Sequence, residues 1–290
     1  IDSAGRTLNA LINDEIDFWE TPSPDLVAGM EGNPDITIKV IDPLGTQGWL
    51  RPNHLNPPFD NAKARQALLH MVKQEDYLQA IIGDQKFWRT CAAYFMCDTP
   101  LDTDIGSGPL MNQDLDEARR LLKEGGYNGE TLILMDPTDI PVLHGASLVT
   151  AQMLRKIGAK VEVQAMDWST LTSRRAETKS IADGGWNIFH TYSTGADVAS
   201  PIANIGISGG CVEEAWFGWP CDKMLEDLRD QFSRKSDPAK QVEIGIALQK
   251  RAYEVVPYVN YGQWFQPTAY RSSLKGVLIS PVPFFWNIEK

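Results

Sequence analysis

DLDEARRLLKEGGYNGETLILMDPTDIPVLHGASLVTAQMLRKIGAKVEVQA, residues 114–165, alternates two helical patterns with two strand patterns. Asp114 is a suitable N-cap for a first helix, in which Leu and Ala recur at helical spacing. TLILM at 131–135 is typical of a strand, Pro141 suits the first turn of a second helix, and VEVQA at 161–165 alternates as a second strand. This order predicts an α/β unit with a largely parallel sheet.

The flanking sequence continues with further helices and strands. Apolar residues at helical spacing predict helices at 7–14, 60–72, 77–82, 222–232 and 237–254. Extended or alternating patterns predict strands at 16–19, 36–41, 47–53, 186–190 and 257–264. Asp60 is the predicted cap of its helix, and Pro52 limits its strand to an edge or a crossing. The stretches 86–113 and 191–220 show no periodicity, and such long loops in compact domains are usually functional.

The composition is that of an ordinary globular protein. The 290 residues are 43% hydrophobic and 22% charged, enough to bury one large core or two smaller ones. A net charge of −11 argues against a nucleic-acid partner, because a nucleic-acid binder would show a basic stripe. No apolar run reaches the roughly 18 residues of a membrane-spanning helix. The chain opens at Ile1 without an initiator Met, so the lack of a visible signal peptide says little about its compartment.

The four cysteines form two pairs that are close in sequence. Cys91 and Cys97 lie in one irregular loop, and Cys211 and Cys221 lie in another. There is no CxxC and no His at metal-ligand spacing, so we predict no metal site. Two local disulfides are predicted, which implies an oxidising compartment. Four buried free thiols remain the alternative.

No motif predicts catalysis or a cofactor. The chain has no H-E-x-x-H, Walker A or G-x-G-x-x-G motif, and its four histidines are scattered. Nine tryptophans are more suggestive, because most of them lie in predicted loops or at strand ends. Aromatic rings with a few polar partners are typical of concave sites for small ligands, although about half of these rings are expected in the core.

Residues 51–82, RPNHLNPPFDNAKARQALLHMVKQEDYLQAII, resemble the signature of the bacterial extracellular solute-binding proteins of family 5, which bind peptides, dipeptides or nickel complexes for ABC importers. Three other segments resemble the family in the expected order: LNALINDEIDFWE at 8–20, DEARRLLKEGGY at 116–127 and AQMLRKIGAKVEVQAMDW at 151–168. Asp14 stands where Gly is usual. The resemblance covers essentially the whole chain.

The resemblance implies a type II periplasmic-binding-protein-like α/β fold, in which two lobes close over a ligand. Family members are considerably longer, so we expect this chain to be a C-terminal part with one complete lobe and remnants of the other. The expected divisions are 1–48 as a remnant of lobe I, 49–55 as a crossing strand, 56–256 as lobe II, 257–264 as the return crossing and 265–290 as the return to lobe I. We expect the remnants to be exposed, disordered, or paired with another copy through free strand edges.

The family's function would be substrate capture. The resemblance implies a protein of the periplasm, with a signal peptide in its precursor, that binds a peptide or an amine-bearing compound and delivers it to a membrane ABC permease. It implies no enzyme activity and no cofactor, and a full-length protein that is a monomer. Two alternatives remain: a ligand sensor that signals through a partner protein, and a hydrolase with carboxylates in the long loops.

Ligand contacts are expected from the crossing strands and from loops at the open edge of the lobe. The expected residues are Asn53, His54, Trp168, Tyr192, Asp197, Tyr261, Gln263 and Trp264. Asp197 stands four residues before Pro201, where the family's amine-binding Asp is expected. The aromatic residues around it differ from the family pattern, and an Asp beside Gly195-Ala196 also suits the alternative of capping a loop turn.

Overall fold

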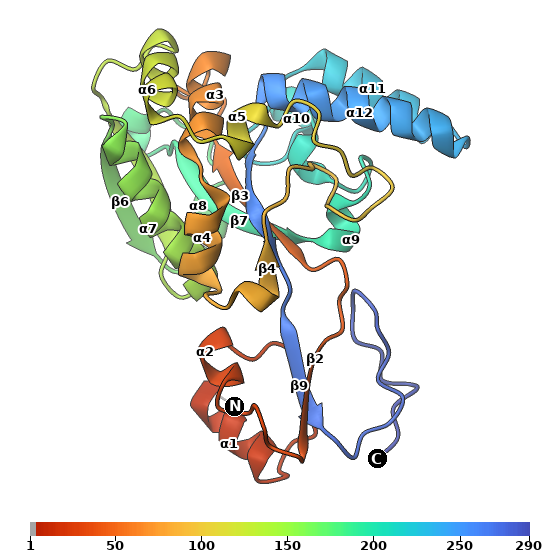
Figure 1. The fold of residues 1–290 in the computed structure, drawn as a ribbon. Helices are drawn as coiled ribbons and strands as arrows, with labels where there is room; N and C mark the ends of the chain where they lie inside the picture. The colour runs from red at the N-terminus through yellow and green to blue at the C-terminus, as the bar shows by residue number, and fades with distance from the viewer. Residues whose placement is uncertain (1–3) are drawn as a thin grey trace.

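The computed structural model describes residues 4–290 and contains two bodies of unequal size, joined by two crossings of the chain (Figure 1). The strands are β1 (Phe18–Trp19), β2 (Ile36–Val40), β3 (Thr46–Pro52), β4 (Trp88–Arg89), β5 (Thr131–Pro137), β6 (Lys160–Met166), β7 (Ile188–Thr194), β8 (Val259–Trp264) and β9 (Pro267–Arg271). The α-helices are α1 (Ala4–Ile12), α2 (Pro24–Val27), α3 (Ala62–Met71), α4 (Gln74–Ile81), α5 (Gly108–Met111), α6 (Leu115–Glu124), α7 (Pro141–Lys156), α8 (Trp168–Arg174), α9 (Gly195–Val198), α10 (Cys211–Glu214), α11 (Lys223–Ser233) and α12 (Pro238–Val255). Three short 3₁₀ turns are η1 (Gln85–Phe87), η2 (Ile181–Asp183) and η3 (Ile205–Ile207).

The large body is built on a six-stranded sheet in the order β4-β8-β3-β7-β5-β6. β5 runs parallel to β6 and β7, whereas β3 runs antiparallel to both β7 and β8. The predicted α/β class is confirmed, and the two strands of the 114–165 unit are parallel as predicted, whereas β3, β8 and β4 pair antiparallel. The reason is the crossing: β3 enters from the small body and β8 returns to it, so these neighbours run in opposite directions.

Caps and turn residues in the sequence predicted the ends of most helices and strands to within a few residues of their ends in the structure. Asp114 caps α6, as predicted, by accepting hydrogen bonds from the backbone of Asp116 and Glu117. The cap of α3 is Asn61 rather than Asp60, and its side chain accepts from the backbone N–H of Lys63. The strand containing Pro52 is internal, not an edge. Pro52 is accommodated because it ends β3, beyond the last residue that pairs with β8.

The stretch 86–113 is a long ordered loop, but it holds more regular secondary structure than its sequence predicts. It includes the end of η1, all of β4 and all of α5, and it buries Tyr94 and Phe95 in the main core. The predicted disulfide Cys91–Cys97 lies within it, with Cα atoms 5.8 Å apart. The second predicted disulfide, Cys211–Cys221, joins Cα atoms 4.1 Å apart. Both disulfide predictions are confirmed.

The small body consists of the sheet β1-β9-β2 with α1 and α2 packed against it. The buried residues of its apolar cluster are Leu11, Val27, Met30, Ile36 and Ala269. Here the expectation for the terminal segments needs correction: β9 pairs with both β1 and β2 of the same chain, so no second copy is needed. Exposure does hold for the C-terminal segment, where Phe285 and Trp286 are 57% and 79% exposed.

The chain passes between the bodies at 41–45 and at 265–266 (Figure 1). The strands expected to make the crossings, 49–55 and 257–264, lie largely inside the six-stranded sheet instead. Across residues 4–290 there is no helix with both the length and the apolar character needed to span a membrane.

Candidate ligand site beside the strand crossing

Strand directions bring the carboxyl ends of four strands to the side of the large body that faces the small one. Thr46, at the start of β3, pairs with Thr194 at the end of β7 and with Trp264 at the end of β8. Because β5 and β6 run parallel to β7, their carboxyl ends point the same way. Ligands of open α/β sheets bind outside the carboxyl ends of strands, so this edge is the candidate site.

A row of aromatic rings leads from the core to this edge. Tyr77 stacks on Tyr261 at 5.3 Å between centroids, Tyr261 stacks on Trp264 at 6.3 Å, and Tyr192 meets Trp264 edge to face at 5.8 Å. Tyr261 and Trp264 are buried, whereas Tyr192 is 46% exposed. The predicted residues Tyr192, Tyr261 and Trp264 are therefore together, and Tyr192 is the ring that faces solvent.

Gln263 and Arg89 join the sheet to the crossing. The Gln263 amide is buried, donates to the carbonyl of Leu44 at 2.6 Å and accepts from Arg89 Nε at 3.0 Å. Arg89 also donates to the carbonyl of Cys97, pairs with Asp98 and lies 5.2 Å from the ring centroid of Phe265. Sequence reasoning missed Arg89, because the stretch around it has no periodicity.

Asp197 lies in α9, at the end of β7, and is exposed. Its carboxylate accepts a hydrogen bond from the Thr194 hydroxyl at 2.9 Å, and that hydroxyl accepts from the Asp197 backbone N–H at 3.3 Å. No cation among residues 4–290 forms an ion pair with Asp197 in the structure. The carboxylate thus helps to cap α9 while it remains accessible at the same edge as Tyr192.

A second polar pair at this edge was not predicted. Asp136, near the end of β5, is buried, and its carboxylate lies 2.8 Å from Nδ1 of His144 in the first turn of α7. This contact fixes the imidazole ring of His144, whose side chain is 38% exposed. No Ser or Cys of the described residues hydrogen-bonds to His144, so the pair lacks the nucleophile of a hydrolytic triad.

Residues 206–210, GISGG, have the spacing of the G-x-S-x-G hydrolase motif. They lie in η3 and the loop after it rather than in a turn between a strand and a helix, so Ser208 is not placed as a nucleophile. Residues 4–290 also hold no cluster of three or more His, Cys, Asp or Glu side chains suited to a metal ion.

Asn53 and His54 lie at the opposite end of β3 from the crossing. The buried Asn53 amide donates to the carbonyl of Trp186 at 2.9 Å and accepts from the backbone N–H of Leu55 at 2.9 Å. His54 donates its backbone N–H to the carbonyl of Gly218, and burial together with Arg65 and Arg51 holds its imidazole pKa well below the usual value. The structure therefore does not bring these two residues to Tyr192 and Asp197.

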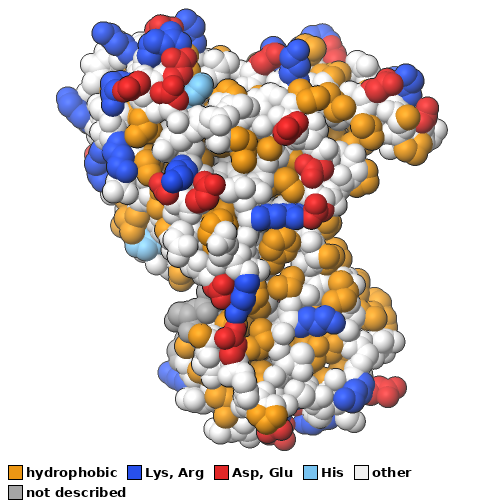
Figure 2. All heavy atoms as spheres, in the orientation of Figure 1, with side chains coloured by type: hydrophobic (Ala, Val, Ile, Leu, Met, Phe, Trp, Pro, Cys, Tyr) orange, Lys and Arg blue, Asp and Glu red, His pale blue; other side chains and the backbone are white. Residues whose placement is uncertain are grey.

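A cleft of about 740 Å³ lies between the two bodies. Val27 and Glu31 line it from the small body, and Ile82, Phe87 and Pro141 line it from the large one. Lys86 pairs with Glu31 across it. Figure 2 shows that the molecule is hollowed at this waist.

Comparison with known proteins gives a consistent result. Residues 1–212 match the family model of the bacterial extracellular solute-binding proteins, family 5. A probable peptide ABC transporter periplasmic-binding protein of Sinorhizobium fredii is 34% identical over 97% of this chain and 53% of its own length. The chain thus spans about half the length of the curated relatives it matches.

Solved structures share the fold. An ABC transporter substrate-binding protein, CtaP, of Listeria monocytogenes aligns with a TM-score of 0.82 at 18% identity, over 95% of this chain and 55% of its own. The Helicobacter pylori periplasmic binding protein DppA, solved with the peptide STSA, aligns with a TM-score of 0.80 at 21% identity, over 99% of this chain and 55% of its own. These likenesses confirm the predicted type II periplasmic-binding-protein fold.

Proposed function

Because the chain belongs to the bacterial extracellular solute-binding proteins of family 5, we propose that it captures a small solute between two lobes for an ABC importer. The protein would work outside the cytoplasm, release the solute unchanged to the membrane permease and need no cofactor. One observation carries the proposal: the carboxyl ends of β5, β6 and β7 and the exposed Tyr192 lie beside the place where the chain crosses between two bodies.

The lobes of this proposal follow the two sheets. Residues 56–256 belong to lobe II, and the flanking strands β3 and β8 complete its sheet. The segments 41–45 and 265–266 are the hinge, and the small body is part of lobe I. A short pair of crossings between separately packed bodies is the arrangement that permits hinge closure around a ligand.

The proposed ligand is a peptide or another amine-bearing compound. Relatives are named for peptides, and one solved neighbour holds the peptide STSA. Asp197 would accept a hydrogen bond from the ligand ammonium, and Tyr192, supported by Trp264, would form an aromatic wall. A charge-assisted bond of this kind is about twice as strong as a neutral one.

The test uses the full-length protein. Mass spectrometry of the natively purified protein should find a bound solute whose mass is unchanged after prolonged incubation. Calorimetry with a panel of di- to tetrapeptides should then give saturable binding. A folded protein that binds no member of the panel and carries no solute would contradict capture, and a solute that is cleaved would indicate an enzyme.

A further inference from the structure

Arg175, which follows α8, is held among four aromatic rings. Its guanidinium carbon lies 4.8 Å from the ring centroid of Phe217, 5.0 Å from Trp216, 5.3 Å from Trp168 and 5.9 Å from Phe189. Phe189 is fully buried and forms the back of this cluster, while the other three rings and Arg175 itself are only half-buried. The Arg175 cage, as we call these five residues, therefore opens to solvent.

The N–H donors of Arg175 differ from those of the buried Arg51 and Arg65 in their hydrogen-bond partners. Arg51 donates to four backbone carbonyls, and Arg65 donates to two. Nε of Arg175 is buried and has no hydrogen-bond partner within residues 4–290, and its guanidinium forms no ion pair there. Aromatic faces attract the charge, but they replace an oxygen acceptor only weakly. An acceptor for this guanidinium is therefore missing.

The local charge is also unbalanced. Trp216 lies between two guanidinium groups, Arg175 at 5.0 Å and Arg51 at 5.3 Å. Burial lowers the pKa of Arg175, and no carboxylate acts against that effect. Burial likewise lowers the pKa of Arg51, to about 9. In a chain with a net charge of −11, two cations without an acidic partner make this position locally positive.

Two carboxylates that adjoin the start of α8 are already used by the backbone. Asp139 accepts a hydrogen bond from the N–H of Trp168 at 2.8 Å, and Asp167 accepts from the N–H of Thr170 at 2.7 Å. Both bonds fix the start of α8, and neither carboxylate pairs with Arg175 in the structure. The cage therefore has a fixed wall and an unfilled acceptor position.

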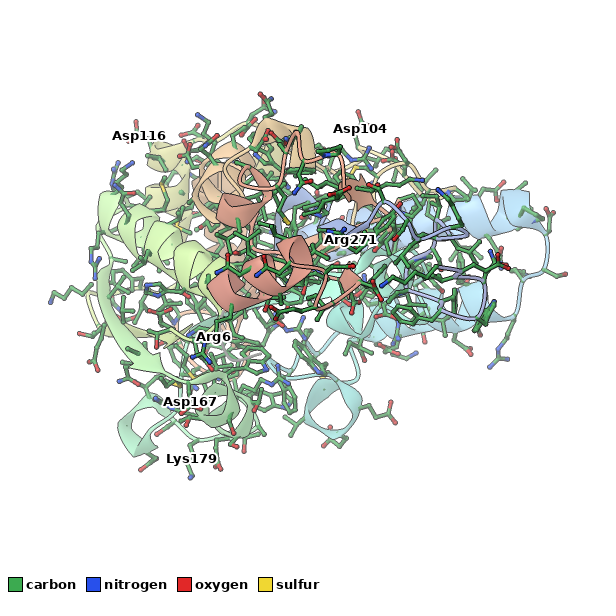
Figure 3. All side chains as sticks on the ribbon, turned by 90° about the horizontal axis from the view of Figure 1, so that it is seen from below. Arg6, Asp104, Asp116, Asp167, Lys179 and Arg271 are labelled. Atoms are coloured by element: carbon green, nitrogen blue, oxygen red, sulfur yellow. A yellow bond between two sulfur atoms is a disulfide. The ribbon has the colours of Figure 1, made fainter. Side chains whose placement is uncertain are left out.

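Trp168 brings one wall of the cage to the sheet edge that the proposed function uses, whereas Phe189 lies opposite Arg51, further from that edge. Trp168 opens α8 directly after the carboxyl end of β6, and Phe189 belongs to β7, the strand that carries Tyr192. In Figure 3, Asp167 at the cap of α8 lies beside the small body rather than beneath it.

We propose that the Arg175 cage binds the carboxylate of the captured solute, and that this carboxylate is flanked by an apolar or aromatic group. The inference rests on the proposed function for the source of the ligand. The planar guanidinium matches a carboxylate through two parallel hydrogen bonds, and the surrounding rings keep water away from them. The same rings would pack against the apolar neighbour of the carboxylate.

Three probes and three variants test this assignment. Phenylacetate, phenylacetamide and inorganic phosphate are titrated into the protein, with calorimetry and the fluorescence of the cage tryptophans as readouts. We expect phenylacetate to bind at least tenfold more tightly than the other two. Arg175→Met should weaken phenylacetate at least tenfold, equivalent to about 1.4 kcal/mol. Arg174→Met is the matched control and should stay within twofold, because Arg174 donates to the carbonyls of Gly184 and Gly185 outside the cage.

Several outcomes would overturn the assignment. If phenylacetamide binds as tightly as phenylacetate, the cage does not select an anion. If phosphate binds as tightly as phenylacetate, the apolar group beside the carboxylate contributes nothing. If Arg175→Met lowers the melting temperature and leaves phenylacetate affinity unchanged, the cage is purely structural. If Arg175→Met does not fold, Arg175→Lys is the test. Lysine keeps the positive charge but lacks the planar guanidinium, so Arg175→Lys should still bind phenylacetate more weakly than the wild-type protein does.

Failure of this inference is distinguishable from failure of the proposed function. If peptides bind to the protein and amidation of their carboxylate changes the affinity less than twofold, the cage assignment fails and solute capture stands. If no peptide binds while phenylacetate binds in an Arg175-dependent way, the cage stands as an anion site and peptide capture fails.

Discussion

The exposed carboxylate of Asp197 has two roles to separate, a cap of α9 and a proposed contact with a ligand ammonium. We predict that Asp197→Asn weakens the binding of an amine-bearing ligand at least tenfold, or about 1.4 kcal/mol, because the amide loses the charge that assists the hydrogen bond. Calorimetry on the full-length protein measures this. Thr194→Ala is the matched control, since it removes the cap hydroxyl but keeps the carboxylate. A twofold or smaller change in Asp197→Asn would show that the residue only caps.

His190 makes the fold sensitive to acid. The ring is fully buried between hydroxyl groups of Thr150, at 2.8 Å, and Ser147, at 3.3 Å, and burial lowers its pKa to about 3. In the unfolded chain the pKa is about 6.5, so the unfolded state binds the proton first as the pH falls. The stability that His190 contributes is complete above pH 6.5 and is lost progressively toward pH 3.

The expected loss for His190 between pH 7 and pH 5 is about 2 kcal/mol of unfolding free energy. Urea unfolding at both pH values measures it. His190→Gln should unfold with a pH dependence that is smaller by this amount, because glutamine does not titrate. Other buried groups, such as His54, contribute equally to both proteins and cancel in the comparison. An unchanged pH dependence in the variant would mean that the pKa of His190 is the same in the native and unfolded states.

At the scale of one strand, Gly48 explains how β3 passes the aromatic row. A Cβ atom at position 48 would lie inside the ring of Tyr261, so only glycine fits there without movement. We predict that Gly48→Ala costs about 1–3 kcal/mol, the usual range for overpacking a core, because Tyr261 is fixed by Tyr77 and Trp264. Chemical denaturation gives the value. Gly108→Ala is the control, since no atom lies within 4 Å of its Cβ position, and it should change stability little.

Single elements also show what sequence reasoning can reach. Asp114, Pro141 and the apolar spacing between 114 and 165 encode their helices locally, so α6, α7, β5 and β6 were predictable. The antiparallel entry of β3 between β7 and β8 was not, because strand order depends on contacts far apart in the sequence. The same holds for the Arg175 cage, whose members come from 168 to 217 and have no shared motif. Recognition of the family by residues 51–82 supplied the fold where local patterns could not.

At the scale of the whole molecule, the two bodies have cores of very different size. The apolar cluster of the small body consists of Leu11, Val27, Met30, Ile36 and Ala269, whereas the large body has two clusters, the larger of which includes buried residues of β3, β5, β7 and β8. Buried apolar area stabilises by roughly 25 cal/mol per Å², so the small body has much less to oppose the entropy of its chain. The cleft contacts, such as Lys86 with Glu31, and the two hinge segments couple it to the large body.

This difference predicts that the bodies open independently. In hydrogen exchange of the 290-residue chain, amides of β9 should exchange at least tenfold faster than amides of β3, because local opening of the small body requires less free energy than opening of the large one. Both strands are internal to their sheets, so an edge position does not explain the difference. Glu31→Gln provides the check on coupling: loss of the charged pair with Lys86 should accelerate exchange in β9 and leave β3 unchanged. If β9 and β3 exchange at the same rate, and Glu31→Gln shifts both together, the two sheets unfold as one unit. The segments 41–45 and 265–266 would then be rigid connections and not a hinge.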